Sequence, residues 1–126
     1  NKSISSFTIP LGATINMDGT AIMQGCATFF LASLYGIDLG MPEILTIVIT
    51  ATIASIGTAG IPSAGIIMLT VIFTQIGIPL EGITLLLGVD RLLDMMRTSI
   101  NVSGDLCISC IVANSENRID ETIFKS

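Results

Sequence analysis

The sequence contains no histidine and no tryptophan, and only 12% of its 126 residues are charged. An average globular domain carries about 25% charged residues. Lysine and arginine are absent between Lys2 and Arg91, so this stretch cannot form the surface of mixed charges that soluble domains turn toward water. A lipid bilayer is the simplest environment that accommodates such a stretch.

Other scarcities exclude several functions. Cys107 and Cys110 form a C-x-x-C pair, but no second pair or histidine completes a zinc site. We expect both to be small, buried packing residues. The net charge of −5 and the lack of a basic patch exclude nucleic-acid binding. An enzyme is not expected either, because there is no nucleophile–base pair and no metal cluster.

The chain begins with Asn1 rather than methionine, and it shows no signal peptide. We therefore expect the C-terminal piece of a longer polypeptide. What the sequence does contain is a series of long apolar blocks, each interrupted by residues that disfavour a helix or a bilayer.

The first block covers residues 7–35, which is longer than the ~20 residues that a spanning helix needs. Residues 16–20 interrupt it with asparagine, aspartate and glycine. These residue types weaken a continuous helix. The block therefore predicts a broken transmembrane helix, with two half-helices joined by an unwound turn.

The second block covers residues 44–78, and its centre at 55–65 is rich in glycine and contains a proline. Such a segment does not stay helical. The flanking arms, 44–54 and 66–76, are each too short to cross a hydrocarbon core of about 30 Å. The block predicts a re-entrant helical hairpin that enters the membrane and turns back.

The ends of the two arms could bind ions. Free carbonyl groups at 55–58, where the first arm ends, can coordinate a cation. Free N–H groups at 63–65, where the second arm begins, favour an anion. Gly60 and Gly65 have the spacing of a phosphate-binding loop, but no lysine follows them, which excludes that interpretation.

The third block, 82–113, predicts one long transmembrane helix. Residues 1–114 are thus expected to form one all-α membrane unit, followed by a polar tail at 115–126. On a helix, five polar side chains of this block fall within roughly 80° of arc. The stripe consists of Asp90, Asp94, Arg97, Asn101 and Asp105.

A charge inside a bilayer costs about 2.5–3.5 kcal/mol, so such a stripe usually faces a substrate or ion path. One alternative is that Asp94 and Arg97 only neutralise each other. That alternative leaves Asp105 and Asp18 unexplained. Oxygen ligands without histidine favour a hard cation. Sodium fits this description, and protons are the competing choice.

Three motifs, at residues 16–20, 57–65 and 94–105, resemble the glutamate transporter family, the dicarboxylate/amino acid:cation symporters. The resemblance covers about residues 7–114. It implies that the blocks are the seventh transmembrane helix, the second re-entrant hairpin and the eighth helix of the moving transport domain. The first hairpin and the scaffold that forms a trimer would lie outside this chain.

The resemblance also implies roles for single residues. Arg97 would clamp the side-chain carboxylate of the substrate, and Asp94 would hold its ammonium group. Further substrate contacts would come from Asn101, Thr20, Thr98, Ile61 and Gly65. One sodium site would use Asp105, Gly12, Asn16 and Asn101. A second would use Thr14, Ser55, Ile56 and Thr58, and a third would include Asp18 and Asn16.

In this family, carriers of neutral amino acids lack arginine at the Arg97 position, and carriers of plain dicarboxylates lack aspartate at the Asp94 position. The presence of both residues therefore implies aspartate or glutamate as the substrate. Gln24 stands where potassium-coupled animal members have glutamate, so potassium counter-transport is not expected.

We expect a multi-pass symporter of the cell membrane, coupled to sodium or protons, that works by alternating access with the hairpin as gate. Contact with lipid and a homotrimer of the full-length protein are implied. The alternatives are a non-transporting membrane fragment, acting as an interaction or structural subunit, and a C4-dicarboxylate carrier.

Overall fold

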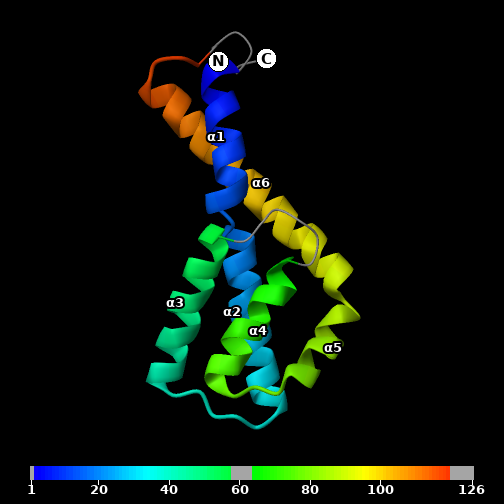
Figure 1. Ribbon diagram of the computed structural model, residues 1–126. Helices are drawn as coiled ribbons and strands as arrows, with labels where there is room; N and C mark the ends of the chain where they lie inside the picture. The colour runs from blue at the N-terminus through cyan, green and yellow to red at the C-terminus, as the bar shows by residue number, and fades with distance from the viewer. Residues whose placement is uncertain (1, 58–63, 120–126) are drawn as a thin grey trace.

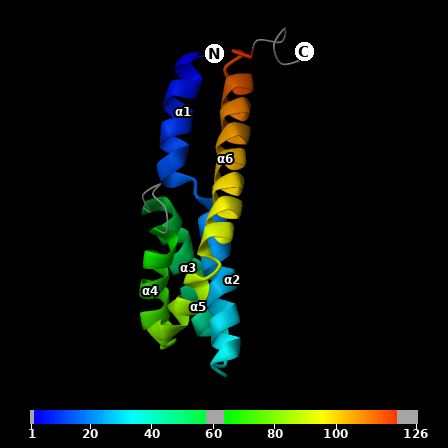
Figure 2. The ribbon, with the colours of Figure 1, turned by 90° about the vertical axis from the view of Figure 1, so that its right-hand side faces the viewer.

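The computed structural model describes residues 2–57 and 64–119. All regular structure within these ranges is helical, which confirms the predicted all-α class. In chain order the elements are α1 (Lys2–Ile15), α2 (Asp18–Leu34), α3 (Met41–Gly57), α4 (Ala64–Ile76), the 3-10 helix η1 (Leu80–Gly82), α5 (Ile83–Leu87) and α6 (Asp90–Ser115). Figures 1 and 2 show α2 to α5 together in one half of the molecule, while α1 and the end of α6 form the other half.

The first block is divided where the sequence predicted, but the break is shorter. Only Asn16 and Met17 separate α1 from α2, because Asp18 already begins α2. An acidic residue in the first turn lies at the positive end of the helix dipole, which favours this start. The break offsets the axis of α1 from the axis of α2 (Figure 2).

The second block forms two helices that lie side by side, α3 and α4, on either side of residues 58–63, which are outside the described ranges (Figure 1). Both arms are longer than predicted, since α3 continues to Gly57 and α4 begins at Ala64. Thr50 Oγ1, near the middle of α3, donates a hydrogen bond of 2.9 Å to Oε1 of Gln75, near the end of α4. This bond links the two arms directly.

The prediction of one continuous helix over 82–113 is wrong. Helix α5 ends at Leu87 and α6 begins only at Asp90, with Gly88 and Val89 between them. Glycine weakens a helix interior, and Leu86 is buried in the core that α2 and the hairpin share. The break lets α6 leave that core at an angle (Figure 1). At the other end α6 reaches Ser115, and residues 120–126 of the expected tail lie outside the described ranges.

None of the described helices is both long enough and apolar enough to cross a bilayer by itself. Helices α2 and α3 have 17 residues each. Such a helix is about 25 Å long, shorter than a hydrocarbon core of about 30 Å. Helix α6 has 26 residues but carries the polar stripe.

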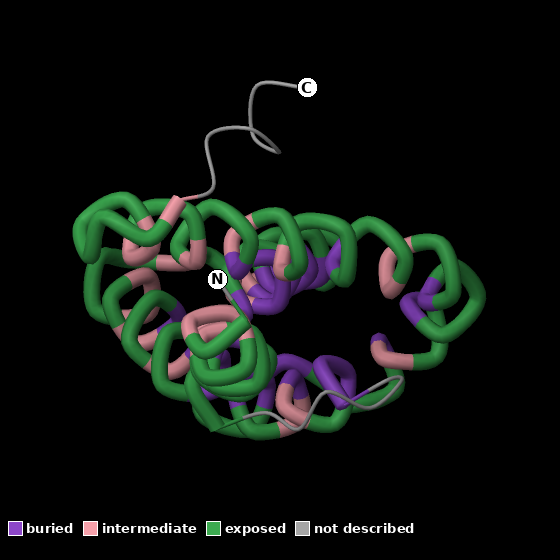
Figure 3. Tube along the Cα trace, turned by 90° about the horizontal axis from the view of Figure 1, so that it is seen from above, coloured by how far each residue is buried: buried purple, intermediate pink, exposed green. Residues whose placement is uncertain are grey.

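The core lies between α2 and the hairpin. Leu31 of α2, Ile47 of α3 and Phe73 of α4 are buried and belong to one hydrophobic cluster. Viewed from above, the buried segments face the inside of the molecule (Figure 3). The outer faces carry large apolar side chains that are exposed, such as Ile53 of α3 and Leu92 of α6. The core therefore holds the hairpin against α2 and brings the start of α4 close to α6.

Candidate functional site

Helix α6 turns its polar stripe inward. Its buried residues are Asp90, Arg97 and Asp105, all of them charged, whereas large apolar side chains such as Leu92 and Met96 are exposed. The stripe faces α1 and α2, and α4 approaches it through Gly65. The structure therefore gathers the predicted polar residues between these helices.

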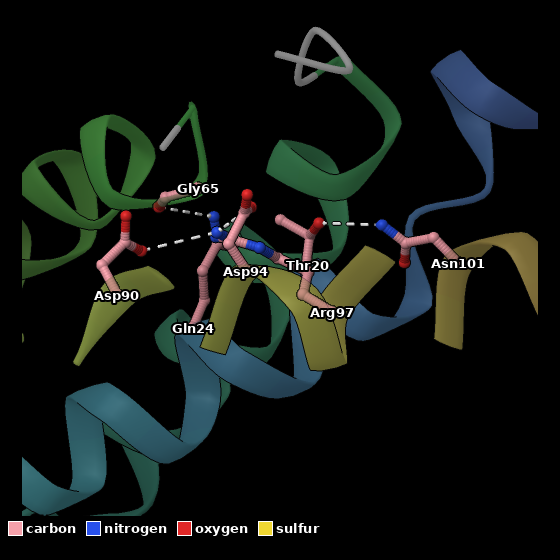
Figure 4. A network of polar contacts seen from close by, with 7 residues as sticks. All are labelled: Thr20, Gln24, Gly65, Asp90, Asp94, Arg97 and Asn101. Atoms are coloured by element: carbon pink, nitrogen blue, oxygen red, sulfur yellow. Dashed lines mark hydrogen bonds and ion pairs between the residues drawn. The ribbon is translucent and has the colours of Figure 1, made fainter. Parts of the chain in front are cut away.

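Arg97 is the centre of an ion-pair cluster (Figure 4). Its Nη2 atom lies 2.5 Å from Asp94 Oδ1 and 3.5 Å from Asp90 Oδ1, and only 5% of its side chain is exposed. The internal pairing considered above thus occurs at Nη2. The Nη1 atom, however, has no hydrogen-bond partner among the described residues, although it is buried.

A buried donor without a partner costs about 1–3 kcal/mol, and more on a charged group. A carboxylate ligand would satisfy such a donor with a charge-assisted hydrogen bond. The two acids hold one end of the guanidinium, and the other end remains available to bind an anion. Asp90 belonged to the predicted stripe but had no predicted role, although its spacing of seven residues from Arg97 places it two helical turns away on the same face.

Three helices converge beside the free end of Arg97. A Cβ atom at Gly65 of α4 would overlap Arg97 Nη1, so only glycine allows this approach. Gln24 of α2 is fully buried, and its Nε2 atom donates a long hydrogen bond of 3.5 Å to the Gly65 carbonyl (Figure 4). Gln24 Oε1 has no partner in the part of the chain that the structure describes. The predicted substrate residues Arg97, Asp94 and Gly65 are therefore brought together.

Asn101 joins the start of α2 to α6. Its Oδ1 atom accepts a hydrogen bond of 2.8 Å from the Gly19 N–H, and its Nδ2 atom lies 3.4 Å from Thr20 Oγ1. The first N–H groups of a helix lack intrahelical partners, so Asn101 caps α2 from another helix. A Cβ atom at Gly19 would lie 2.6 Å from the Arg97 carbonyl oxygen. This role of Gly19 was not predicted from the sequence, although its place inside the 16–20 motif was an available signal.

Asp105 lies in a second cluster with two of its predicted partners. Asn16 Nδ2 donates a hydrogen bond of 3.0 Å to Asp105 Oδ1. A Cβ atom at Gly12 would overlap the Asp105 carboxylate. Within the described ranges no lysine or arginine forms an ion pair with Asp105, which is only 7% exposed. A buried carboxylate in these surroundings can accept a cation.

The polar groups of this cluster are the Asp105 carboxylate, the Asn16 amide and the backbone of Gly12. Such oxygen donors suit a hard cation. The described residues contain no group of three or more histidine, cysteine or acidic side chains that could hold a metal ion. By donor type, the oxygen atoms of the Asp105 cluster fit a hard cation better than a transition metal.

Other predicted ion ligands are not joined by contacts. Thr14 is exposed, and its hydroxyl donates to the Leu11 carbonyl at 2.8 Å. Ser55 is buried, and its hydroxyl donates to the Thr52 carbonyl at 2.8 Å. No hydrogen bond in the described ranges links the two, although α1 and α3 do touch. Of three more predicted ligands, Ile56 is exposed, Asp18 is exposed and lies beside Gly104 together with the Asn16 amide, and Thr58 is outside the described residues.

Of the two remaining substrate residues, Thr98 is exposed and Ile61 lies outside the described residues. Thr98 and Asp94 line a hollow of about 660 Å³ along the outer side of α6. Asp94 thus has one oxygen on Arg97 and a side chain that is still 23% exposed.

The expectation that Cys107 and Cys110 are buried packing residues is wrong. Both are free and exposed on α6, and Cys26 of α2 is exposed as well. Burial of the charged stripe leaves the other faces of α6 outside, and these faces carry the two thiols.

The sequence pattern of the Sodium:dicarboxylate symporter family matches residues 1–115. Over 105 residues the chain is 50% identical to human excitatory amino acid transporter 3 and 51% identical to mouse excitatory amino acid transporter 2. It is also 50% identical over 105 residues to excitatory amino acid transporter 1 of Rattus norvegicus.

Each of these alignments covers 83% of this chain. The chain spans only 20%, 18% and 19% of the three relatives, in that order. Most of each relative therefore has no counterpart here. The family match nevertheless covers nearly the whole chain and agrees with the three sequence motifs. The chain therefore belongs to the sodium:dicarboxylate symporter family, a family of transporters and not of enzymes.

Proposed function

We propose that this chain is part of the transport domain of a sodium-coupled symporter for acidic amino acids. The observation that carries the proposal is Arg97, which is buried, held at Nη2 by two acids and without a partner at Nη1 among the described residues. The names of the relatives, which are excitatory amino acid transporters, support the same substrate class.

The side-chain carboxylate of aspartate or glutamate would bind at Arg97 Nη1, beside Gly65. Asp94 would hold the ammonium group, because its carboxylate is still partly exposed. Asn101 and Thr20 lie on the same side of α6 as Arg97 and bond to each other, so they would complete the polar wall. Thr98 and Ile61 are the remaining proposed contacts.

Asp105 would be the main sodium ligand, together with Asn16 and the carbonyl groups of Gly12 and Asn101. The contacts of Asp105 with Asn16 and Gly12 support this assignment. We keep the second and third sites as proposals on the family resemblance alone. Their residues are Thr14, Ser55, Ile56 and Thr58 for the second site, and Asp18 with Asn16 for the third.

Members of this family are multi-pass membrane proteins, and we place the protein in the cell membrane. The break between α1 and α2 and the pairing of α3 with α4 support half-helices and a re-entrant hairpin. The hairpin would gate the site, because its second arm begins beside Arg97. The substrate would cross by alternating access, in a homotrimer of the complete protein.

The test is uptake of labelled L-aspartate into proteoliposomes that contain the longest native polypeptide with this chain. A sodium gradient and a proton gradient are applied separately. We expect uptake with the sodium gradient alone. Uptake with only the proton gradient would assign the coupling to protons, and no uptake with either would favour a non-transporting subunit.

One observation favours a second substrate class, the C4-dicarboxylates. Asp94 Oδ1 is already bound to Arg97, so Asp94 could serve only to neutralise the guanidinium and never meet an ammonium group. Competition separates the two classes. If succinate displaced aspartate with equal affinity, the protein would be a dicarboxylate carrier, whereas we expect succinate to compete poorly.

A further inference from the structure

A pair of hydroxyl groups joins α1 to α6 one helical turn away from the Asp105 cluster. Thr8 Oγ1 and Ser109 Oγ lie 2.7 Å apart, and either can be the donor. Each hydroxyl is also near a carbonyl oxygen of its own helix. Thr8 Oγ1 lies 3.0 Å from the Ile4 carbonyl oxygen, and Ser109 Oγ lies 2.8 Å from that of Asp105.

The protons available decide how these contacts can be used. A hydroxyl group donates one hydrogen bond and can accept two. Thr8 and Ser109 therefore have two protons for three close contacts. When one proton occupies the 2.7 Å contact between the two hydroxyls, it bridges the helices. The other proton is then left to bind a backbone carbonyl. The pair is thus a link between α1 and α6 and not two separate surface hydroxyls.

The link lies in register with the Asp105 cluster. Helices α1 and α6 run in opposite directions (Figure 2). Gly12 follows Thr8 by four residues, and Asp105 precedes Ser109 by four residues. Four residues are about one turn. Because the two helices are antiparallel, the step from Thr8 to Gly12 and the step from Ser109 to Asp105 run in the same direction. The Thr8–Ser109 contact therefore stands one turn from the contact of Gly12 with Asp105.

This register matters because Gly12 is the residue that makes room for the carboxylate. A Cβ atom there would overlap Asp105, and the neighbours of Gly12 on α1 all have larger side chains. A sliding movement of α1 along α6 would bring such a side chain against the carboxylate. It would also separate Asn16 Nδ2 from Asp105 Oδ1, which are 3.0 Å apart.

We propose that Thr8 and Ser109 are positioning residues for the cation site at Asp105. Their hydrogen bond fixes the register of α1 on α6 and so keeps the Gly12 carbonyl, the Asn16 amide and the Asp105 carboxylate together. The inference rests on the proposed sodium site and extends it to two residues that touch no ion.

The experiment uses the longest native polypeptide that contains this chain, with the variants Ser109→Ala and Thr8→Val. The measurement is the sodium concentration that half-saturates L-aspartate binding, together with aspartate affinity at saturating sodium. Loss of one interhelical hydrogen bond should raise the sodium half-saturation roughly threefold to tenfold. Aspartate affinity at saturating sodium should stay at the wild-type value.

Ser103→Ala is the matched control. Ser103 Oγ also donates to the carbonyl four residues earlier, at 2.8 Å, but it is exposed and has no partner on α1 among the described residues. We expect Ser103→Ala to behave as wild type. Ser109→Thr keeps the hydroxyl and should restore sodium affinity. The double variant should be no worse than either single variant, because both remove the same bond.

Several results would overturn the inference. One is an unchanged sodium half-saturation in both single variants. Another is an equal loss of sodium affinity, aspartate affinity and thermal stability, which would mean a structural role only. If the wild type bound no aspartate, the proposed function would fail instead. The link between Thr8 and Ser109 would then be tested by thermal unfolding without substrate. Sodium should raise the thermal midpoint of the wild type more than that of Ser109→Ala, and an equal rise in both proteins would refute the inference.

Discussion

Arg97 and Asp105 lie on the same inward face of α6, about two turns apart, yet their surroundings differ. Two acids hold one end of Arg97, while Asp105 meets the amide of Asn16 and the backbone of Gly12. The first arrangement leaves a donor for an anion, and the second leaves acceptors for a cation. This difference agrees with the proposed binding of an anionic substrate together with sodium.

Arg97→Ala should abolish binding of L-aspartate. The loss should be about 100-fold or more, because a charge-assisted hydrogen bond contributes about 1.5–3 kcal/mol and a bidentate pair more than that. Binding to purified protein measures it. Arg91→Ala is the control, since Arg91 is exposed on the same helix. Equal aspartate affinity in wild type and Arg97→Ala, with both proteins folded, would refute the substrate assignment.

Asp105→Asn should weaken the dependence on sodium. The change keeps the size of the side chain but removes its charge, so the sodium half-saturation should rise about tenfold or more. A sodium titration of aspartate binding measures the effect. Asp38→Asn serves as the control, because Asp38 is exposed in the loop between α2 and α3. Identical titrations for Asp105→Asn and wild type would count against a sodium ligand at this position.

At the scale of helices, glycines decide how closely the elements approach. Gly19 lets α2 meet the backbone of α6, and Gly65 lets α4 meet the Arg97 side chain. The break at 16–17 falls within a segment that asparagine and glycine marked in the sequence, and α3 ends and α4 begins inside the segment that glycine and proline marked. The break at Gly88 was missed, since one glycine in an apolar run is a weak signal.

Gly19→Ala should separate α2 from α6. Its Cβ atom would lie 2.6 Å from a backbone carbonyl oxygen, which cannot move without shifting the helix. We expect a loss of about 1–3 kcal/mol in stability, as overpacking usually causes. Denaturation in detergent measures it. Gly25→Ala on the same helix has nothing within 4 Å of its Cβ atom and should be neutral or slightly stabilising. Equal stability of the Gly19 and Gly25 variants would contradict the close approach.

For the whole molecule, the outer surface and the buried face of α6 differ from those of a soluble bundle. Charged residues of α6 are buried, while large apolar side chains are exposed on every helix from α1 to α6. Exposed apolar surface of this extent marks contact with lipid or with other protein.

The chain produced by itself should therefore associate with membranes and need detergent to remain in solution. Its exposed apolar faces would otherwise associate with one another in water. Fractionation of cells followed by size-exclusion chromatography measures this behaviour. A monomer that is stable in detergent-free buffer would contradict the environment inferred from the outer faces.

The sequence by itself determined the all-α class, the break between α1 and α2 and the family, because composition, periodicity and short motifs are local properties. The tertiary structure decided what each charge meets. Whether Arg97 was neutralised could not be read from spacing, since Asp90 and Asp94 were both within reach. The contacts of Gly19, Gly65 and the Thr8–Ser109 pair join residues far apart in the chain. Such contacts depend on how helices pack, and packing is a property of the whole fold.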